Sequence, residues 1–187
     1  ALTPPKIPSE NAVLLIGAGI AGMRAAIDLA DTGSTVHLIE KGHFVGGRTA
    51  QWGELYPTGQ TGGELVRSFY DEIVKRDGIT LHTGCEAVAK SGSLGNFEIG
   101  LRIMPRGFRG AADVPASADF GTRLAKAIEA CPVTVPDPFE FGLSERKALY
   151  LDPGGLPAVP AVDREVCTKC GECVKICPEI DLDSEEK

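Results

Sequence analysis

Apolar runs separated by glycine turns indicate alternating strands and helices in the first hundred residues. Residues 12–16 are apolar throughout, which predicts a buried strand. Similar short runs predict strands over 35–39 and 79–82, and the alternation over 96–103 predicts another. Apolar side chains within 64–76 recur at helical spacing and predict an amphipathic helix. This order of elements is typical of an α/β fold.

Glycine and proline divide the chain into two domains. The sequence holds 23 glycines and 13 prolines, and they interrupt the pattern repeatedly after residue 104. The segment MPRGFRGAADVPASAD, residues 104–119, therefore predicts a linker. The predicted boundaries are an N-terminal arm at 1–10, a first domain at 11–103, this linker and a second domain at 120–187.

The first domain carries a glycine pattern between its first strand and the following helix. Gly17, Gly19 and Gly22 form G-x-G-x-x-G directly after the apolar run. The first glycine permits a tight turn, the second lets the backbone approach a pyrophosphate, and the third lets the helix pack closely on the strand. Glu40 ends the second strand, where an acidic residue binds ribose hydroxyls. The sequence thus predicts a Rossmann-type dinucleotide site.

A second glycine pattern indicates which dinucleotide the site binds. Gly46, Gly47 and Arg48 follow Glu40 and resemble the FAD-binding pattern of the glutathione and thioredoxin reductase class, so FAD is favoured over the alternative of an NAD-binding reductase fragment. In that class the position of Val88 supplies backbone contacts to the adenine. The predicted cofactor-binding residues are Gly17, Gly19, Ile20, Ala21, Gly22, Glu40, Lys41, Gly46, Gly47, Arg48 and Val88.

The second domain carries four closely spaced cysteines. Cys167, Cys170, Cys173 and Cys177, followed by Pro178, match the C-x2-C-x2-C-x3-C-P run of bacterial ferredoxins. A structural zinc site is the alternative, but zinc usually uses two separated C-x2-C pairs. The run predicts an iron-sulfur centre in a ferredoxin-like α+β domain.

An earlier cysteine-proline pair, Cys131 and Pro132, matches the end of a second such run. The three preceding cysteine positions of that run are occupied by Gly121, Leu124 and Ala127, so one cluster is expected to be lost.

In two-cluster ferredoxins the last cysteine of each run serves the other cluster. The predicted ligands of one 4Fe-4S cluster are therefore Cys131, Cys167, Cys170 and Cys173. In the alternative assignment Cys177 is the fourth ligand, and Cys131 is a small buried hydrophobic residue.

With both patterns in one chain, the sequence resembles the A subunit of heterodisulfide reductase and its relatives in quinone-interacting oxidoreductase and benzoyl-CoA reductase complexes. The resemblance rests on VLLIGAGIAGMRAAIDLA, IEKGHFVGGRTAQ, GNFEIGLRIMPR and the segment from CPVTVPDPFEFGLSERKALYLDPGG to CTKCGECVKICP. It implies a subunit that moves electrons between flavin and clusters within a larger complex.

Three departures limit this resemblance. The first is the lost cysteine triad, and the second is the absence of cysteine in residues 49–65, where many relatives carry it. Third, the sequence stops at DLDSEEK, where the flavin domain of the family resumes. The resemblance thus covers only the N-terminal half of the family, which implies either a naturally split protein, completed by another chain, or a trimmed product.

Charge and hydropathy narrow the classes of partner. The net charge of -7 disfavours nucleic acid, and no apolar stretch is long enough to span a membrane. Cysteines that bind a cluster must stay reduced, and the cytoplasm keeps thiols reduced, so the sequence favours a cytoplasmic location. The leading hypothesis is an electron-transfer subunit of an anaerobic oxidoreductase that works with other redox subunits. The alternative is a non-catalytic assembly module with a vestigial nucleotide site and a structural cluster.

Overall fold

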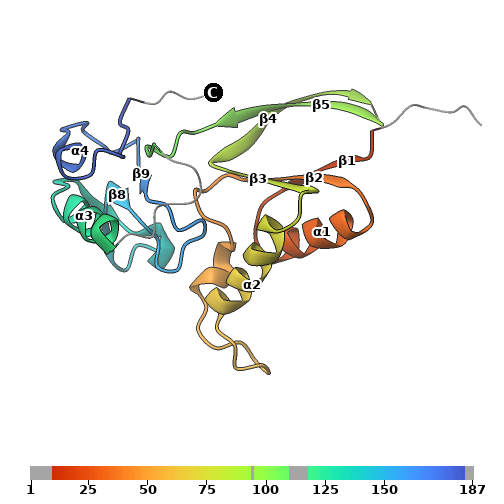
Figure 1. Cartoon of the computed structure of the whole chain (residues 1–187), viewed down its shortest axis with the longest axis horizontal. Coiled ribbons are helices and arrows are strands. Elements are labelled where there is room, and N and C mark those ends of the chain that lie inside the picture. The colour runs from red at the N-terminus through yellow and green to blue at the C-terminus, as the bar shows by residue number, and fades with distance from the viewer. Residues whose placement is uncertain (1–9, 94, 110–117, 184–187) are drawn as a thin grey trace, which may run out of the picture.

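The computed structural model describes residues 10–93, 95–109 and 118–183. They form a three-stranded parallel sheet with two helices, followed by a smaller C-terminal part rich in loops (Figure 1). Nearly all of the predicted N-terminal arm lies outside the described residues, as do residues 110–117 of the predicted linker. The mixed α/β class predicted from the sequence is confirmed.

The parallel sheet is built from the apolar runs of the first domain. Its strands are β1 (Ala12–Ile16), β2 (Thr35–Glu40) and β3 (Ile79–Thr83), in the order β1-β2-β3. The central strand β2 buries Val36, Leu38 and Ile39. Strand β1 lies at an edge of this sheet, with β2 as its one described neighbour.

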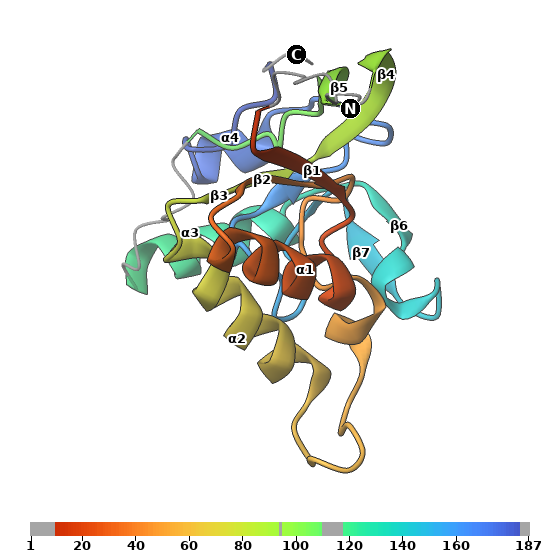
Figure 2. The same ribbon diagram turned by 90° about the vertical axis from the view of Figure 1, so that its right-hand side faces the viewer.

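Two helices cover one face of the sheet, α1 (Ile20–Asp31) and α2 (Gly62–Val74), as Figure 1 and Figure 2 show. Helix α1 buries Met23, Ala26 and Ile27, which are three and four residues apart and therefore lie on one face. Helix α2 begins with a capping box, in which Thr61 Oγ1 accepts from the Glu64 amide and the Glu64 carboxylate accepts from the Thr61 amide. The short 3-10 helix η1 (Gly47–Gln51) precedes α2.

An antiparallel ribbon of β4 (Cys85–Ser93) and β5 (Asn96–Ile103) lies on the side of the sheet away from the helices (Figures 1 and 2). Its register shifts between Ala87 and Ala89, which indicates a β-bulge.

The C-terminal part has its own apolar core. Its elements are α3 (Ala118–Glu129), β6 (Thr134–Pro136), η2 (Pro138–Glu140), β7 (Glu145–Lys147), β8 (Leu149–Tyr150), β9 (Ala161–Val162) and α4 (Glu172–Ile176). Helices α3 and α4 pack together, and Phe120, Leu124 and Ile180 are buried between the elements of this part.

The first residues of the predicted linker belong to this C-terminal part. Phe108 forms an antiparallel bridge with Ile180, and the Arg109 amide donates to the carbonyl of Glu179 at 2.6 Å. The Val162 amide donates to the carbonyl of Arg106 at 2.9 Å. These backbone pairings join distant segments, and the glycine and proline content of this stretch did not predict them.

Candidate cofactor sites

The G-x-G-x-x-G turn has the geometry that a dinucleotide site requires. Gly17 has φ +99°, a conformation that favours glycine. A Cβ at Gly22 would lie 2.0 Å from the Gly17 carbonyl oxygen, so only glycine lets α1 approach the turn this closely. A Cβ at Gly19 would meet no atom within 4 Å, which leaves the backbone there open to a ligand. The three glycines therefore have different physical roles.

The double glycine lies directly beside this turn. Gly46 forms a parallel bridge with Gly19, and its amide donates to the carbonyl of Ala18 at 2.8 Å. Gly46 has φ +102°, and a Cβ there would lie 2.6 Å from Cγ1 of Val66 on α2. Two glycine patterns that are distant in sequence thus meet at one place, which is what a shared phosphate-binding site needs.

The carboxylate of Glu40 reaches the same turn from the carboxyl end of β2. Its Oε2 accepts from the Ala18 amide at 2.8 Å, and its Oε1 accepts from the Gly42 amide at 2.9 Å. The acidic group therefore lies beside the N-terminus of α1, where ribose hydroxyls bind in Rossmann-type sites.

The other predicted FAD contacts are peripheral to the turn. Ile20 and Ala21 form the first turn of α1. Arg48 is exposed in η1, and Lys41 forms an exposed ion pair with Glu86 at 3.0 Å. Val88 is exposed on β4, at the bulge of the ribbon.

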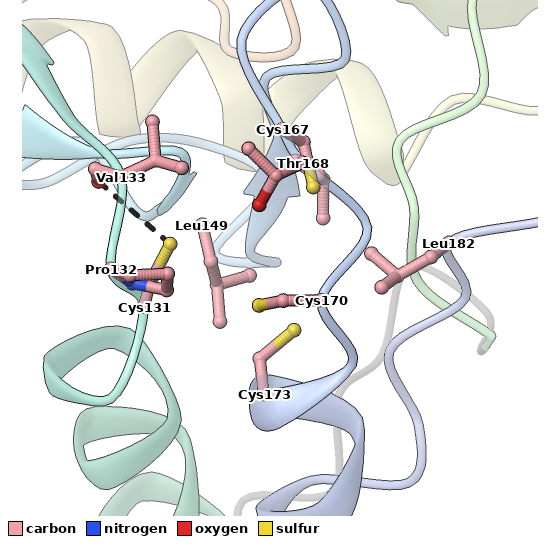
Figure 3. Close-up of a pocket in the computed structure, with 10 residues that line it drawn as sticks. Cys131, Pro132, Val133, Leu149, Cys167, Thr168, Cys170, Cys173 and Leu182 are labelled. Atoms are coloured by element: carbon pink, nitrogen blue, oxygen red, sulfur yellow. Dashed lines mark hydrogen bonds between the residues drawn. The ribbon is translucent and has the colours of Figure 1, made fainter.

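A second candidate site lies in the C-terminal part, where four cysteines line one cavity (Figure 3). Cys131 comes from the residues directly after α3, whereas Cys167, Cys170 and Cys173 come from the loop before α4 and its first turn. These are the four cysteines that the sequence predicted as ligands. Leu149, Val162 and Leu182 contribute apolar walls.

The loop around this cavity has unusual backbone geometry. Lys169 has φ +53° and Gly171 has φ +79°, so the chain turns sharply between the cysteines. The Lys169 amide donates to Sγ of Cys167 at 3.4 Å. Burial is the main cause that raises the pKa of Cys173, and the charge of Cys167 raises it further. Cys131 and Cys170 make smaller contributions in the same direction.

The donor set of the cavity consists of four thiols. Within the ranges that the structure describes, no three His, Cys, Asp or Glu side chains are grouped closely enough to hold one ion. Four thiolates are the donor set that a 4Fe-4S cluster takes.

Cys177 lies outside the cavity, in the apolar core beside Leu124 and Ala127. It is fully buried, and its Sγ donates to Oε2 of Glu179 at 3.2 Å. Burial, and next the hydrogen bond to Glu179, raise the pKa of this thiol to about 11. Two of the three lost cysteine positions, Leu124 and Ala127, are thus part of a packed core, whereas Gly121 is exposed.

The comparisons with known proteins cover most of the chain. The family model of FAD-dependent oxidoreductases matches residues 12–104. The iron-sulfur A subunit of the CoB-CoM heterodisulfide reductase of Methanocaldococcus jannaschii is 33% identical over 93% of this chain and 26% of its own length. One of the corresponding A subunits of Methanopyrus kandleri is 35% identical over 84% of this chain and 23% of its own length.

The chain is similar in sequence to the A subunit of heterodisulfide reductase. The resemblance inferred from the sequence is confirmed, and it extends over most of this chain. The family match to FAD-dependent oxidoreductases also supports the FAD prediction for the N-terminal part. The chain spans about a quarter of the length of the curated relatives that it matches.

Among solved structures, the thioredoxin reductase of T. acidophilum is 28% identical over 49% of this chain and 30% of its own length, with a TM-score of 0.42.

None of the helices in the described ranges combines the length and apolarity needed to cross a membrane.

Three residues at the loop that carries Gly46 were not predicted from the sequence to have a structural role. Phe44, Arg106 and Leu156 join the loop that carries Gly46 to the C-terminal part. No local sequence pattern marks these residues, because their partners are distant in the chain.

Proposed function

We propose that this chain is the electron-transfer subunit of a multi-subunit anaerobic oxidoreductase, similar to the A subunit of heterodisulfide reductase, and that it passes electrons between FAD and one 4Fe-4S cluster. The observation that carries this proposal is the cavity lined by Cys131, Cys167, Cys170 and Cys173. It lies in the same chain as two adjacent glycine patterns and a match to FAD-dependent oxidoreductases.

The N-terminal part provides the groups that FAD needs. The first turn of α1 presents free amide groups and the positive end of the helix dipole to a pyrophosphate, next to the open backbone of Gly19. Glu40 is placed to accept hydrogen bonds from the ribose, and Arg48 is free to reach phosphate oxygens. Bound FAD supplies the ability to take up two electrons and release them singly.

The C-terminal part would hold the cluster in a ferredoxin-like arrangement with a crossed fourth ligand. Cys131 approaches the cavity from α3, opposite the three cysteines beside α4 (Figure 3). The pairing of Phe108 with Ile180 brings the two ends of this part together. The Lys169 amide, which donates to Sγ of Cys167, would raise the reduction potential by stabilising charge on the sulfur.

The partners proposed for this chain are other redox subunits, including a polypeptide that supplies the rest of the flavin domain. Strand β1 is at the edge of the sheet, and Ile16 at its end is 72% exposed, so another parallel strand has room to pair there. All six cysteines of the chain are free thiols. Free thiols are typical of proteins in a reducing compartment such as the cytoplasm.

The alternative function is an assembly module in which the cluster is structural and the nucleotide site is vestigial. The packed core around Cys177 favours it, because a second cluster has no space there and a relay through two clusters within this part is excluded.

The content of iron, acid-labile sulfide and flavin in anaerobically isolated protein tests the proposal. It should be measured on the chain alone and with the proteins that co-purify with it. Four irons with one FAD are expected for the redox subunit, and FAD retained only with a companion chain would indicate a shared flavin site. Four irons without flavin in both preparations would favour the assembly module.

A further inference from the structure

The loop at residues 43–47, which carries the double glycine, is bonded to both parts of the molecule. On one side the Gly46 amide donates to the carbonyl of Ala18, in the dinucleotide turn, at 2.8 Å. On the other side the Val45 amide donates to the carbonyl of Leu156, in the C-terminal part, also at 2.8 Å. The side chain of Leu156 is buried in the core of the N-terminal part. The C-terminal part therefore completes the packing of the proposed flavin loop.

The aromatic ring of Phe44 strengthens this junction. It meets the ring of Tyr150 edge to face, with centroids 5.9 Å apart. Gly155 lies against the same ring, and a Cβ at that glycine would be 2.7 Å from Cδ1 of Phe44. A shift of the 43–47 loop would therefore disturb the segment 150–156 of the C-terminal part.

Arg106 connects three segments at this junction. Its Nη1 donates to the carbonyl of Val159 at 2.8 Å, and its Nη2 donates to Oγ1 of Thr83 at 3.0 Å and to the carbonyl of His43. Its guanidinium also lies over the ring of Phe44, 5.1 Å from the centroid.

A planar guanidinium with five donors can serve several acceptors at once, which a lysine cannot do in the same geometry. Burial lowers the pKa of Arg106 to about 10, so the group is still charged at neutral pH. Its removal would leave the carbonyl groups of His43 and Val159 without this donor.

We propose that Arg106 is a positioning residue that couples FAD binding on the 43–47 loop to the docking of the C-terminal part. The coupling rests on the proposed function, in which Gly46 and Gly47 contact FAD. A ligand that orders this loop stabilises its bonds to Leu156 and to Arg106, which also holds the carbonyl of Val159. By thermodynamic linkage those bonds strengthen the binding of the ligand. The flavin site and the cluster-bearing part are thereby held in one relative position.

The test compares Arg106→Gln with wild type in the full chain, isolated anaerobically with its cluster. FAD affinity is measured by fluorescence titration, and hydrogen exchange is measured with and without FAD. Wild type should show FAD-induced protection both in the dinucleotide turn and in residues 150–162. Arg106→Gln should bind FAD about tenfold more weakly, because hydrogen bonds from a buried cation are lost. In Arg106→Gln, FAD should still protect the dinucleotide turn from hydrogen exchange but should no longer protect residues 150–162.

Two further variants separate coupling from general damage. Gly155→Ala places a methyl group against Phe44 and so disturbs the junction from the C-terminal part. It should also weaken FAD binding. This variant tests the coupling if Arg106→Gln fails to fold. Arg67→Gln, at an exposed position on α2, should change neither property.

Two results would overturn the coupling. Normal FAD affinity in Gly155→Ala and in folded Arg106→Gln, with wild-type protection of residues 150–162, would refute the coupling alone. A wild-type chain that binds no FAD, with or without its co-purifying partners, would refute the proposed function and the coupling together.

Discussion

Cys131 and Cys177 are each followed by proline and each buried, yet the immediate surroundings of their sulfurs differ. Cys131 lines a cavity together with three other cysteines. Cys177 lies in a packed core, where Glu179 accepts its hydrogen bond and Arg123 holds that carboxylate through two nitrogens at 2.8 and 3.0 Å. The comparison teaches that the same dipeptide becomes a candidate ligand or a core residue according to the space around its sulfur.

The largest expected effect is on cluster content. Cys131→Ser should lose the cluster, because one of its four thiolates is removed, and Cys177→Ser should retain it, because that sulfur does not reach the cavity. Iron and sulfide analysis with the visible absorbance of the two variants measures the difference. Retention in Cys131→Ser with loss in Cys177→Ser would reverse the assignment of the fourth ligand.

The core around Cys177 should be sensitive to truncation. Leu124→Ala is expected to lower the free energy of unfolding by about 2–5 kcal/mol, because it removes a buried side chain and leaves a cavity. Urea unfolding measures this value, and Leu143→Ala, at a position that is 89% exposed, is the control. Equal stability of the two variants would show that the region around Leu124 is not a packed core.

The two cysteine environments should also differ in reactivity with pH. In the apoprotein at pH 8, exposed Cys170 should be alkylated readily. Cys177 should react about a hundredfold more slowly than an ordinary thiol, because burial and Glu179 raise its pKa from 9.0 to about 11 and keep it protonated. Its rate should rise with pH until the thiolate forms near pH 11. Mass spectrometry of timed alkylation tests this, and rapid modification of Cys177 at pH 8 would contradict it.

The smallest effect is expected from the ion pair beside Cys177. Arg123→Gln should lower the free energy of unfolding by about 1 kcal/mol or less, because both partners are about one-third exposed and solvent screens their attraction. Arg24→Gln, which removes an exposed ion pair on α1, is the matched control in the same urea experiment. If Arg123→Gln lowered the free energy of unfolding as much as Leu124→Ala, the ion pair rather than apolar packing would be the main stabilising interaction around Cys177.

The dinucleotide turn could be predicted because its signals are local. The strand, the three glycines and the helix follow one another directly, and Glu40 ends the next strand. The grouping of Cys131 with the later cysteines could also be predicted, but only from the register of its cysteine-proline pair. It remains a prediction that these residues bind FAD and a cluster.

Other features could not be predicted because they depend on contacts between distant segments. The pairing of Phe108 with Ile180 placed the first residues of the predicted linker in the C-terminal part. Arg106 lies in the segment that was predicted as a linker, although its guanidinium joins three segments. Nothing in the neighbouring sequence distinguishes such residues, since their role depends on which carbonyl groups the fold brings within reach.

The position of the turn and the residue types available as ligands follow from the amino-acid sequence alone, because glycine conformation and thiol chemistry are properties of single residues and short spacings. The fold places Cys131 at a cavity and encloses Cys177 among Leu124, Ala127 and Glu179, which the sequence had left as alternatives. The fold also bonds the 43–47 loop to both parts of the molecule. Such features are not visible in the sequence, because space and desolvation around a side chain arise from packing between segments far apart in the chain.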